Sequence, residues 1–242
     1  MTLPGAHPTR VKAPDVSRGE EVGILRDGCR QLGVSTPPGA LDTLLDYLDL
    51  LEKWNRAYNL TAIRERSDML VRHLLDSLSV LPHLRGSRFL DIGTGAGLPG
   101  IPLSILEPQR QFVLLDSNGK KTRFLFQVRL ALSLANVEIV DSRIENYRPA
   151  QPFDGVLSRA FASLPDMVTL CDHLMLDGAH LYAMRGAAGE DETHGLQQSG
   201  MPAHCEPLHV PGLDEPRSLV TIYPPGKRDA GRRGSDHMKT RG

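Results

Sequence analysis

Glycine is concentrated in the segment FLDIGTGAGLPG, residues 89–100, directly after an apolar run. Glycine lets a chain turn tightly and lets a ligand approach the backbone. Two registers fit the segment. Gly95, Gly97 and Gly100 match the G-x-G-x-x-G pattern of dinucleotide binders, which is a weak signal by itself. In the other register an acid, Asp91, precedes the first glycine by two residues. A plain tight turn is a poorer explanation, because one turn does not require four glycines.

Three physical features favour the second register. The apolar run stops at Ile92, so the turn begins at Gly93. A pyrophosphate needs free backbone N–H groups at a helix N-terminus, and two prolines in the next turn remove two of them. The carboxylate of Asp91 would repel phosphates but suits a cationic ligand. S-adenosylmethionine carries an ammonium and a sulfonium, so the loop predicts this cofactor, with Gly93 and Gly95 as binding residues.

Acidic residues also follow the next two apolar segments. Asp116 ends QFVLLD, where an acid accepts hydrogen bonds from ribose hydroxyls. Both NAD and S-adenosylmethionine contain that ribose, so Asp116 indicates a nucleoside cofactor without choosing between them. After VEIVD come Ile144 and Glu145. A backbone group or carboxylate there either meets the adenine edge or is an ordinary surface group.

The segment LSRAF, residues 157–161, is where the acceptor of a methyltransferase is often recognised. It lacks the Asn/Asp-Pro-Pro-aromatic element that holds an exocyclic amine, and no Pro-Cys pair supplies a nucleophile. A ring nitrogen such as guanine N7 has a free lone pair and needs no general base, so no catalytic residue is assigned. Arg159 either reads N7 and O6 or contacts the cofactor. The cofactor role is favoured, because Arg159 leaves the strand end at cofactor height.

Basic residues near the expected mouth of the site are predicted RNA contacts. They are Arg72, His73, Lys120, Lys121, Arg123 and Arg185. The cations of the run 120–123 lie in the first turn of a predicted helix, where the helix dipole disfavours positive charge. This placement suggests that they bind an anion. A solvated helix start is the alternative for this run, and a hydrogen-bonded structural histidine is the alternative for His73.

The elements that position these residues change in kind along the chain. Residues 21–84 have a helical period, with apolar side chains at three- and four-residue steps. From Arg88, short apolar strands alternate with helices, which predicts a parallel sheet covered on both faces. The last apolar segments have no helix between them and predict an antiparallel pair at one edge. We therefore expect an α/β fold, with a helical cap at 20–85 and a cofactor-binding core at 86–224.

Composition restricts the class of protein. The 242 residues are 40% hydrophobic and 24% charged, as in ordinary globular proteins, and hold neither an apolar membrane span nor a secretory signal. Three scattered cysteines form no metal cluster and no disulfide framework, which favours a reducing cytosol. Both ends, 1–19 and 225–242, are basic and polar, and are expected to be disordered tails. These tails are solvated chain ends, or, if the substrate is a polyanion, they are arms that bind its phosphates without sequence specificity.

Together these residues closely resemble the RsmG family, also called glucose-inhibited division protein B, from about Leu41 to Tyr223. The resemblance rests on WNRAYNLT at 54–61, RH at 72–73 with DS at 76–77, DIGTGAGLPGIPLS at 91–104, LDS at 115–117, DG at 154–155 and SRAFA at 158–162. Members are class I S-adenosylmethionine-dependent methyltransferases with a Rossmann-like, seven-stranded sheet, and they modify N7 of one guanine in 16S rRNA. The resemblance implies that Gly93 and Leu98 line the cofactor site, Asp116 binds ribose, Ile144 and Glu145 meet adenine, and Arg159 lies at the reacting end.

The hypothesis is therefore a cytoplasmic, S-adenosylmethionine-dependent 16S rRNA guanine-N7 methyltransferase. We expect it to be a monomer that uses no metal and no membrane. The substrate is naked 16S rRNA, or 16S rRNA within the small ribosomal subunit or an assembly intermediate. Two rivals remain at this stage. One is an NAD-dependent Rossmann oxidoreductase, and the other is a non-catalytic RNA-binding protein of ribosome assembly.

Overall fold

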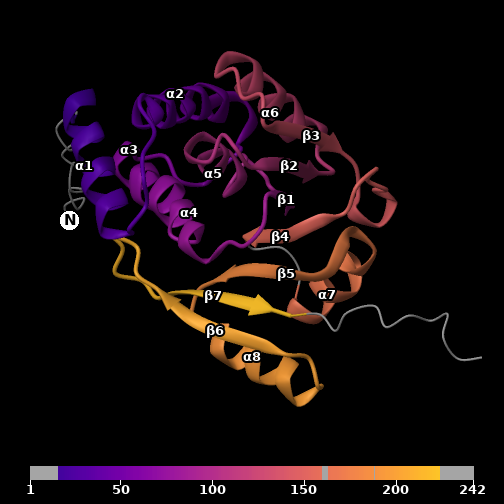
Figure 1. The fold of residues 1–242 in the computed structure, drawn as a ribbon. Coiled ribbons are helices and arrows are strands. Elements are labelled where there is room, and N and C mark those ends of the chain that lie inside the picture. The colour runs from indigo at the N-terminus through magenta and orange to yellow at the C-terminus, as the bar shows by residue number, and fades with distance from the viewer. Residues whose placement is uncertain (1–15, 160–162, 188, 224–242) are drawn as a thin grey trace, which may run out of the picture.

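A mixed β-sheet forms the centre of the molecule in the computed structural model, which describes residues 16–159, 163–187 and 189–223 (Figure 1). Within that part of the chain the sheet has seven strands in the order β3-β2-β1-β4-β5-β7-β6. Their bounds are β1 Arg88–Ile92, β2 Gln111–Asp116, β3 Val137–Asp141, β4 Phe153–Arg159, β5 Met175–Arg185, β6 Ala203–Leu208 and β7 Arg217–Ile222.

The strand directions agree with the pattern expected from the sequence. β1 to β5 pair in parallel, whereas β7 runs antiparallel to both β5 and β6. The strand order reverses between β1 and β4, and ligands of open α/β sheets bind outside the carboxyl ends of the strands at such a switch point. The carboxyl edge around β1 and β4 is therefore where a site is expected.

Helices precede the sheet and connect its strands. They are α1 Arg18–Gln31, α2 Ala40–Tyr58, α3 Arg66–Met69, the π-helical η1 Leu70–Leu75, α4 Asp76–Leu78, α5 Gly100–Leu106, α6 Gly119–Ala131, α7 Leu164–Cys171 and α8 Gly189–Gln198. Short 3-10 turns lie at η2 Leu81–His83, η3 Ile144–Asn146 and η4 Asp172–Leu174. The sequence analysis did not predict α8. Among the described helices, none combines the length and the apolar character that crossing a membrane requires.

The start of α1 corrects the predicted N-terminal tail. Ser17 caps the helix and forms a capping box with Glu20, in which each side chain bonds the other's backbone N–H. Arg18 then forms ion pairs with Asp46 and Asp49 of α2. The boundary of the tail at residue 19 was wrong, because the helix already begins at Arg18. The rest of this tail up to residue 15, and the C-terminal tail 225–242, lie outside the described residues.

Two hydrophobic clusters cover the two faces of the sheet. Phe89 of β1 belongs to the cluster that contains Leu44 and Leu48 of α2, while its neighbour Leu90 belongs to the cluster with Met167 of α7. This alternation is that of a strand buried on both faces. The N-terminal helices thus share their core with the sheet, and Figure 1 shows α2 and α4 lying beside α5.

Candidate functional site

The glycine loop begins where the sequence predicted, directly after β1 ends at Ile92. Gly93 and Gly95 both have φ of 62°, in the left-handed region that favours glycine. A Cβ on Gly100 would lie 2.2 Å from Cδ2 of Leu114, so packing requires that glycine. A Cβ on Gly95 would meet nothing closer than 3.9 Å. The first part of the loop is therefore set by backbone conformation and leaves space for a ligand.

Asp91 holds the loop from inside the protein. Its Oδ2 accepts hydrogen bonds from Oγ1 of Thr94 at 2.7 Å and from the backbone N–H of Gly100 at 2.9 Å, and the residue is fully buried. Burial raises the pKa of Asp91 to about 7, although these hydrogen bonds and the charge of Arg159 lower it. The interpretation of Asp91 as an acid that faces a cationic ligand needs correction, because its bonded oxygen is directed at the loop.

Tyr47 of α2 anchors the same loop from the helical region. Its ring is fully buried, and its hydroxyl donates a hydrogen bond of 2.8 Å to the carbonyl of Ala96. Burial raises the pKa of this hydroxyl, so it stays a donor. The sequence analysis missed Tyr47, since a tyrosine within an apolar helix stripe looks like ordinary core.

A cavity of about 140 Å³ lies at the carboxyl ends of β1, β2 and β3. It brings together four predicted cofactor residues, Gly93, Asp116, Ile144 and Glu145. Its remaining lining residues are Ile92, Leu115, Ser117, Ser142 and Arg143. The side chain of Leu98 does not line this cavity, because it is only 4% exposed and packs in the hydrophobic core. A cofactor could therefore contact Leu98 only through the backbone of this residue.

Asp116 is the carboxylate of this cavity. Its Oδ1 accepts from the backbone N–H of Asn118 at 2.9 Å, and its Oδ2 accepts from the backbone N–H of Gly95 at 2.9 Å. Nζ of Lys121 lies 3.5 Å from Oδ2. Lys121, a predicted RNA contact, therefore pairs with the carboxylate of Asp116, although it does not line the cavity. Lys120 and Arg123 are exposed, so their contact with RNA stays a prediction.

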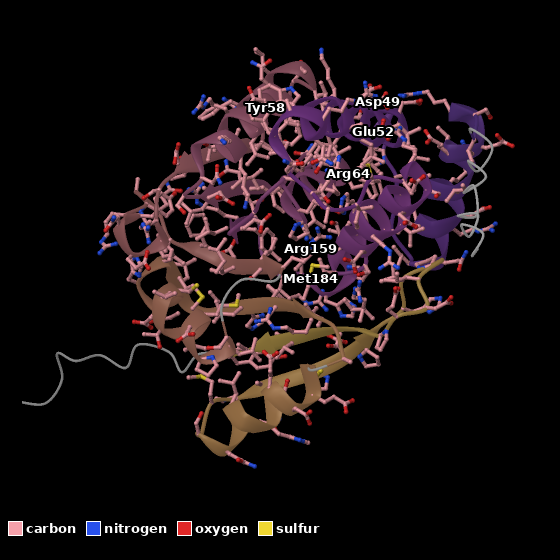
Figure 2. All side chains as sticks on the ribbon, turned by 180° about the vertical axis from the view of Figure 1, so that it is seen from behind. Asp49, Glu52, Tyr58, Arg64, Arg159 and Met184 are labelled. Atoms are coloured by element: carbon pink, nitrogen blue, oxygen red, sulfur yellow. The ribbon has the colours of Figure 1, made fainter. Side chains whose placement is uncertain are left out.

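A second cavity, of about 340 Å³, lies where β4 and β5 end and β7 begins. Four arginines and one carboxylate dominate its lining, which consists of Ile63, Arg72, Asp76, Arg159, Met184, Arg185, Gly186 and Arg217. We call it the arginine cavity. Figure 2 shows Arg159 and Met184 next to each other in this region. Arg159, predicted at the cofactor, thus lines the arginine cavity and not the cavity around Asp116.

Asp76 organises the arginine cavity. Nη1 of Arg159 donates to the carbonyl of Arg72 at 2.9 Å and lies 3.3 Å from Oδ2 of Asp76, while Nε of Arg217 lies 3.3 Å from Oδ1. Burial raises the pKa of Asp76, and the two arginines oppose this shift. No role was predicted for Asp76 or Arg217, since the contacts of Asp76 with Arg159 and Arg217 join residues far apart in the chain.

The other predicted RNA residues differ in accessibility. Arg72 forms an ion pair with Glu215 at the cavity rim. The side chain of Arg185 is only 9% exposed and pairs with Glu192 at 3.1 Å. His73 was wrong as an RNA contact, because it is 2% exposed and its Nε2 lies 2.9 Å from Oγ1 of Thr61. Burial and the charge of Arg159 lower the pKa of His73 to about 4, which identifies a neutral structural histidine.

Both cavities lie at the carboxyl edge of the sheet, where the strand order predicts a ligand. Residues 160–162, which follow β4, lie outside the described part of the chain. Among the described residues, no group of three or more His, Cys, Asp or Glu side chains is arranged to hold a metal ion. The arrangement offers a carboxylate for a nucleoside on one side and guanidinium groups for an electron-rich partner on the other.

Comparison with known proteins gives matches over most of the chain. The family model described as rRNA small subunit methyltransferase G matches residues 40–220. Ribosomal RNA small subunit methyltransferase G from Saccharophagus degradans is 48% identical over 205 residues, covering 85% of this chain and 92% of that protein. The Shewanella amazonensis protein of the same name is 54% identical over 179 residues, covering 74% and 87%.

A solved structure described as a SAM dependent methyltransferase from Aquifex aeolicus superimposes with a TM-score of 0.52 at 16% identity, covering 66% of this chain and 94% of that one. This likeness confirms the predicted fold, a Rossmann-like α/β sheet. With the match of the family model and the identity to both relatives, the chain belongs to the GidB family, described as rRNA small subunit methyltransferase G.

Proposed function

We propose that the protein transfers a methyl group from S-adenosylmethionine to N7 of one guanine in 16S rRNA. The observation that carries this proposal is the match of residues 40–220 to the family described as rRNA small subunit methyltransferase G. The choice of N7 rests on the resemblance and on the chemistry of the residues around the arginine cavity. We also propose that the protein is a cytoplasmic enzyme, and we expect the protein to act as a monomer.

The cavity at β1 to β3 fits the nucleoside part of S-adenosylmethionine. A carboxylate has about four lone-pair positions, and two of those on Asp116 accept from backbone N–H groups. Nζ of Lys121 also lies 3.5 Å from Oδ2, so the position that remains on Oδ1 is suited to a ribose hydroxyl. Ile144 and Glu145 line the same cavity and are suited to the adenine ring and its edge. The cofactor, when bound, supplies a methyl group on a positively charged sulfur.

The arginine cavity fits an acceptor that carries lone pairs. Guanine presents N7 and O6 side by side, and a guanidinium can donate to both or to a phosphate. The contacts of Arg159 with Asp76 and with the carbonyl of Arg72 fix the orientation of its guanidinium. An arginine stays protonated and cannot serve as a general base. N7 has no proton to lose, so positioning the acceptor is the task that remains for these side chains.

The test is transfer of labelled methyl groups to small ribosomal subunits that lack the modification, and in parallel to naked 16S rRNA. We expect label in rRNA, at a guanine that becomes sensitive to cleavage by borohydride and aniline. Cofactor binding with no label on either substrate would favour a non-catalytic assembly protein. Tight NADH binding with no response to S-adenosylmethionine would overturn the whole proposal. Asp116→Asn should weaken cofactor binding, and Lys120→Gln is its control in the same segment.

A further inference from the structure

An exposed aromatic ring ends α2 close to the proposed site. Tyr58 is 45% exposed, and its ring stacks on Trp54 with centroids 5.2 Å apart at an interplanar angle of 30°. Trp54 in turn packs against Phe124 of α6, with centroids 5.7 Å apart. Tyr58 is therefore backed by two further rings, and much of its own surface stays in solvent. A ring held in this way can stack a planar partner at little cost in side-chain entropy.

Two exposed arginines lie near this ring. Arg56 and Arg64 line a cavity of about 260 Å³, and neither forms an ion pair with any residue in the described ranges. Nη2 of Arg64 donates to Oδ1 of Asn59, the residue after Tyr58, at 3.1 Å. Glu52 also lines this cavity, but its carboxylate lies 3.7 Å from Nη1 of Arg66. The two arginines thus keep their charge available for an anion.

The segment between Tyr58 and Arg64 connects this surface to the arginine cavity. Ile63 lines the arginine cavity, while its neighbour Arg64 lines the smaller cavity. The segment is held in place because the backbone N–H of Thr61 donates to Oδ1 of Asn55 at 2.9 Å. In Figure 2, Tyr58, Arg64 and Arg159 lie in this order from the top of the view towards its centre. A chain that places one group in the arginine cavity can therefore continue over this segment.

We propose that a surface made of Tyr58, Arg56 and Arg64, which we call the α2 rim, binds a nucleotide that flanks the methylated guanine. The exposed ring of Tyr58 stacks with an unpaired base, and the two arginines contact the sugar–phosphate backbone. Unpaired RNA is recognised by this combination of aromatic stacking and positive charge. The inference rests on the proposed function, since it assigns the path of the substrate of that same site.

The test compares Tyr58→Leu with Tyr58→Phe, and the double variant Arg56→Gln/Arg64→Gln with Arg26→Gln/Arg129→Gln. The control arginines are also exposed and make no ion pair with a described residue. For methylation of unmodified small subunits, we expect Tyr58→Leu to raise KM about 10-fold at unchanged kcat, and Tyr58→Phe to behave as wild type. We expect Arg56→Gln/Arg64→Gln to reduce the slope of log affinity against log salt for naked 16S rRNA by about 1.4. The control pair should leave that slope unchanged.

Trp54 adds a direct signal, because it is the only tryptophan of the chain and lies against Tyr58. A single-stranded oligoribonucleotide should change its fluorescence in the wild type and in Tyr58→Phe, and much less in Tyr58→Leu. An unchanged KM for Tyr58→Leu together with an unchanged salt slope would overturn the inference, as would equal losses in the control pair. A loss with small subunits but not with naked rRNA would also contradict it, because the surface would then contact a ribosomal protein. If the wild type labels no rRNA, the proposed function fails instead.

Discussion

Replacing Tyr47 by phenylalanine tests how the helical region supports the cofactor loop. Tyr47→Phe removes one hydroxyl and keeps the fully buried ring, so it opens no large cavity. The hydrogen bond of 2.8 Å to the carbonyl of Ala96 is lost, and Ala96 is itself only 5% exposed. A buried acceptor left without its partner costs about 1–3 kcal/mol. We therefore expect the free energy of unfolding to fall by about 1–3 kcal/mol.

The same change should weaken cofactor binding, since Ala96 lies between two loop glycines. If the loop must be re-ordered when the ligand binds, each 1 kcal/mol of that cost lowers affinity about fivefold. We expect S-adenosylmethionine to bind about 5-fold or more weakly. Urea denaturation followed by fluorescence of the single Trp54 gives the stability, and calorimetric titration gives the affinity.

Tyr182→Phe is the matched control. Tyr182 is also buried, and its hydroxyl accepts from the backbone N–H of Arg85 at 3.1 Å, away from the glycine loop. The Tyr182→Phe variant should lose about as much free energy of unfolding as Tyr47→Phe and keep its affinity for S-adenosylmethionine. Unchanged stability and affinity in Tyr47→Phe would refute the anchoring role. Equal losses of affinity in both variants would show that the effect on binding is global.

Two further substitutions and one titration probe the site. Gly93→Val should abolish binding of S-adenosylmethionine in calorimetric titration, because a β-branched residue is strained at a φ of 62°; unchanged affinity would refute the loop assignment. Asp91 has a folded-state pKa of about 7, above its ordinary value, so it binds a proton in the folded state that the unfolded chain releases. Its contribution to stability therefore falls as pH rises from about 4 to about 7, and denaturation of Asp91→Asn should show a flatter pH profile than the wild type. His73 has a pKa lowered to about 4, so NMR should show it neutral at pH 5.5, and its contribution to stability should fall as pH drops from about 6.5 towards 4; protonation near 6.5 would contradict its burial.

Sequence reasoning succeeded where the physical signal was local. The end of β1 at Ile92 follows from the apolar run, and the position of Asp116 at the end of β2 follows in the same way. The capping box of Ser17 with Glu20 was equally local, but the sequence analysis overlooked it and relied on the polar composition of the first residues. Helix α8 was missed because GEDETHGLQQ has almost no apolar period, and little more than Thr193 and Leu196 is buried there.

Contacts between distant residues could not be predicted from one sequence. Tyr47 bonds Ala96 across 49 positions, and Arg159 meets Asp76 across 83. For His73 the sequence left two interpretations open, an RNA contact and a hydrogen-bonded structural histidine, and only the structure decides for the second. The burial of His73 depends on packing against other segments, of which the contact with Thr61 is one. A residue type at a given spacing thus indicates possible chemistry, and packing decides which possibility is realised.

The glycine loop shows how the correct register was reached for a partly incorrect reason. Asp91 was expected to attract a cation, yet it binds the backbone N–H of Gly100. That bond removes a donor from the first turn of α5. Ile101 and Leu103 donate their N–H groups to backbone carbonyls, and Pro102 has none. A pyrophosphate at this helix start would therefore find no free N–H in the turn. A ligand that binds the carboxylate of Asp116 and the accessible backbone of the loop does not need those N–H groups. The loop disfavours a dinucleotide because its donors are already used, and the fold of the loop needs Asp91 as a hydrogen-bond acceptor.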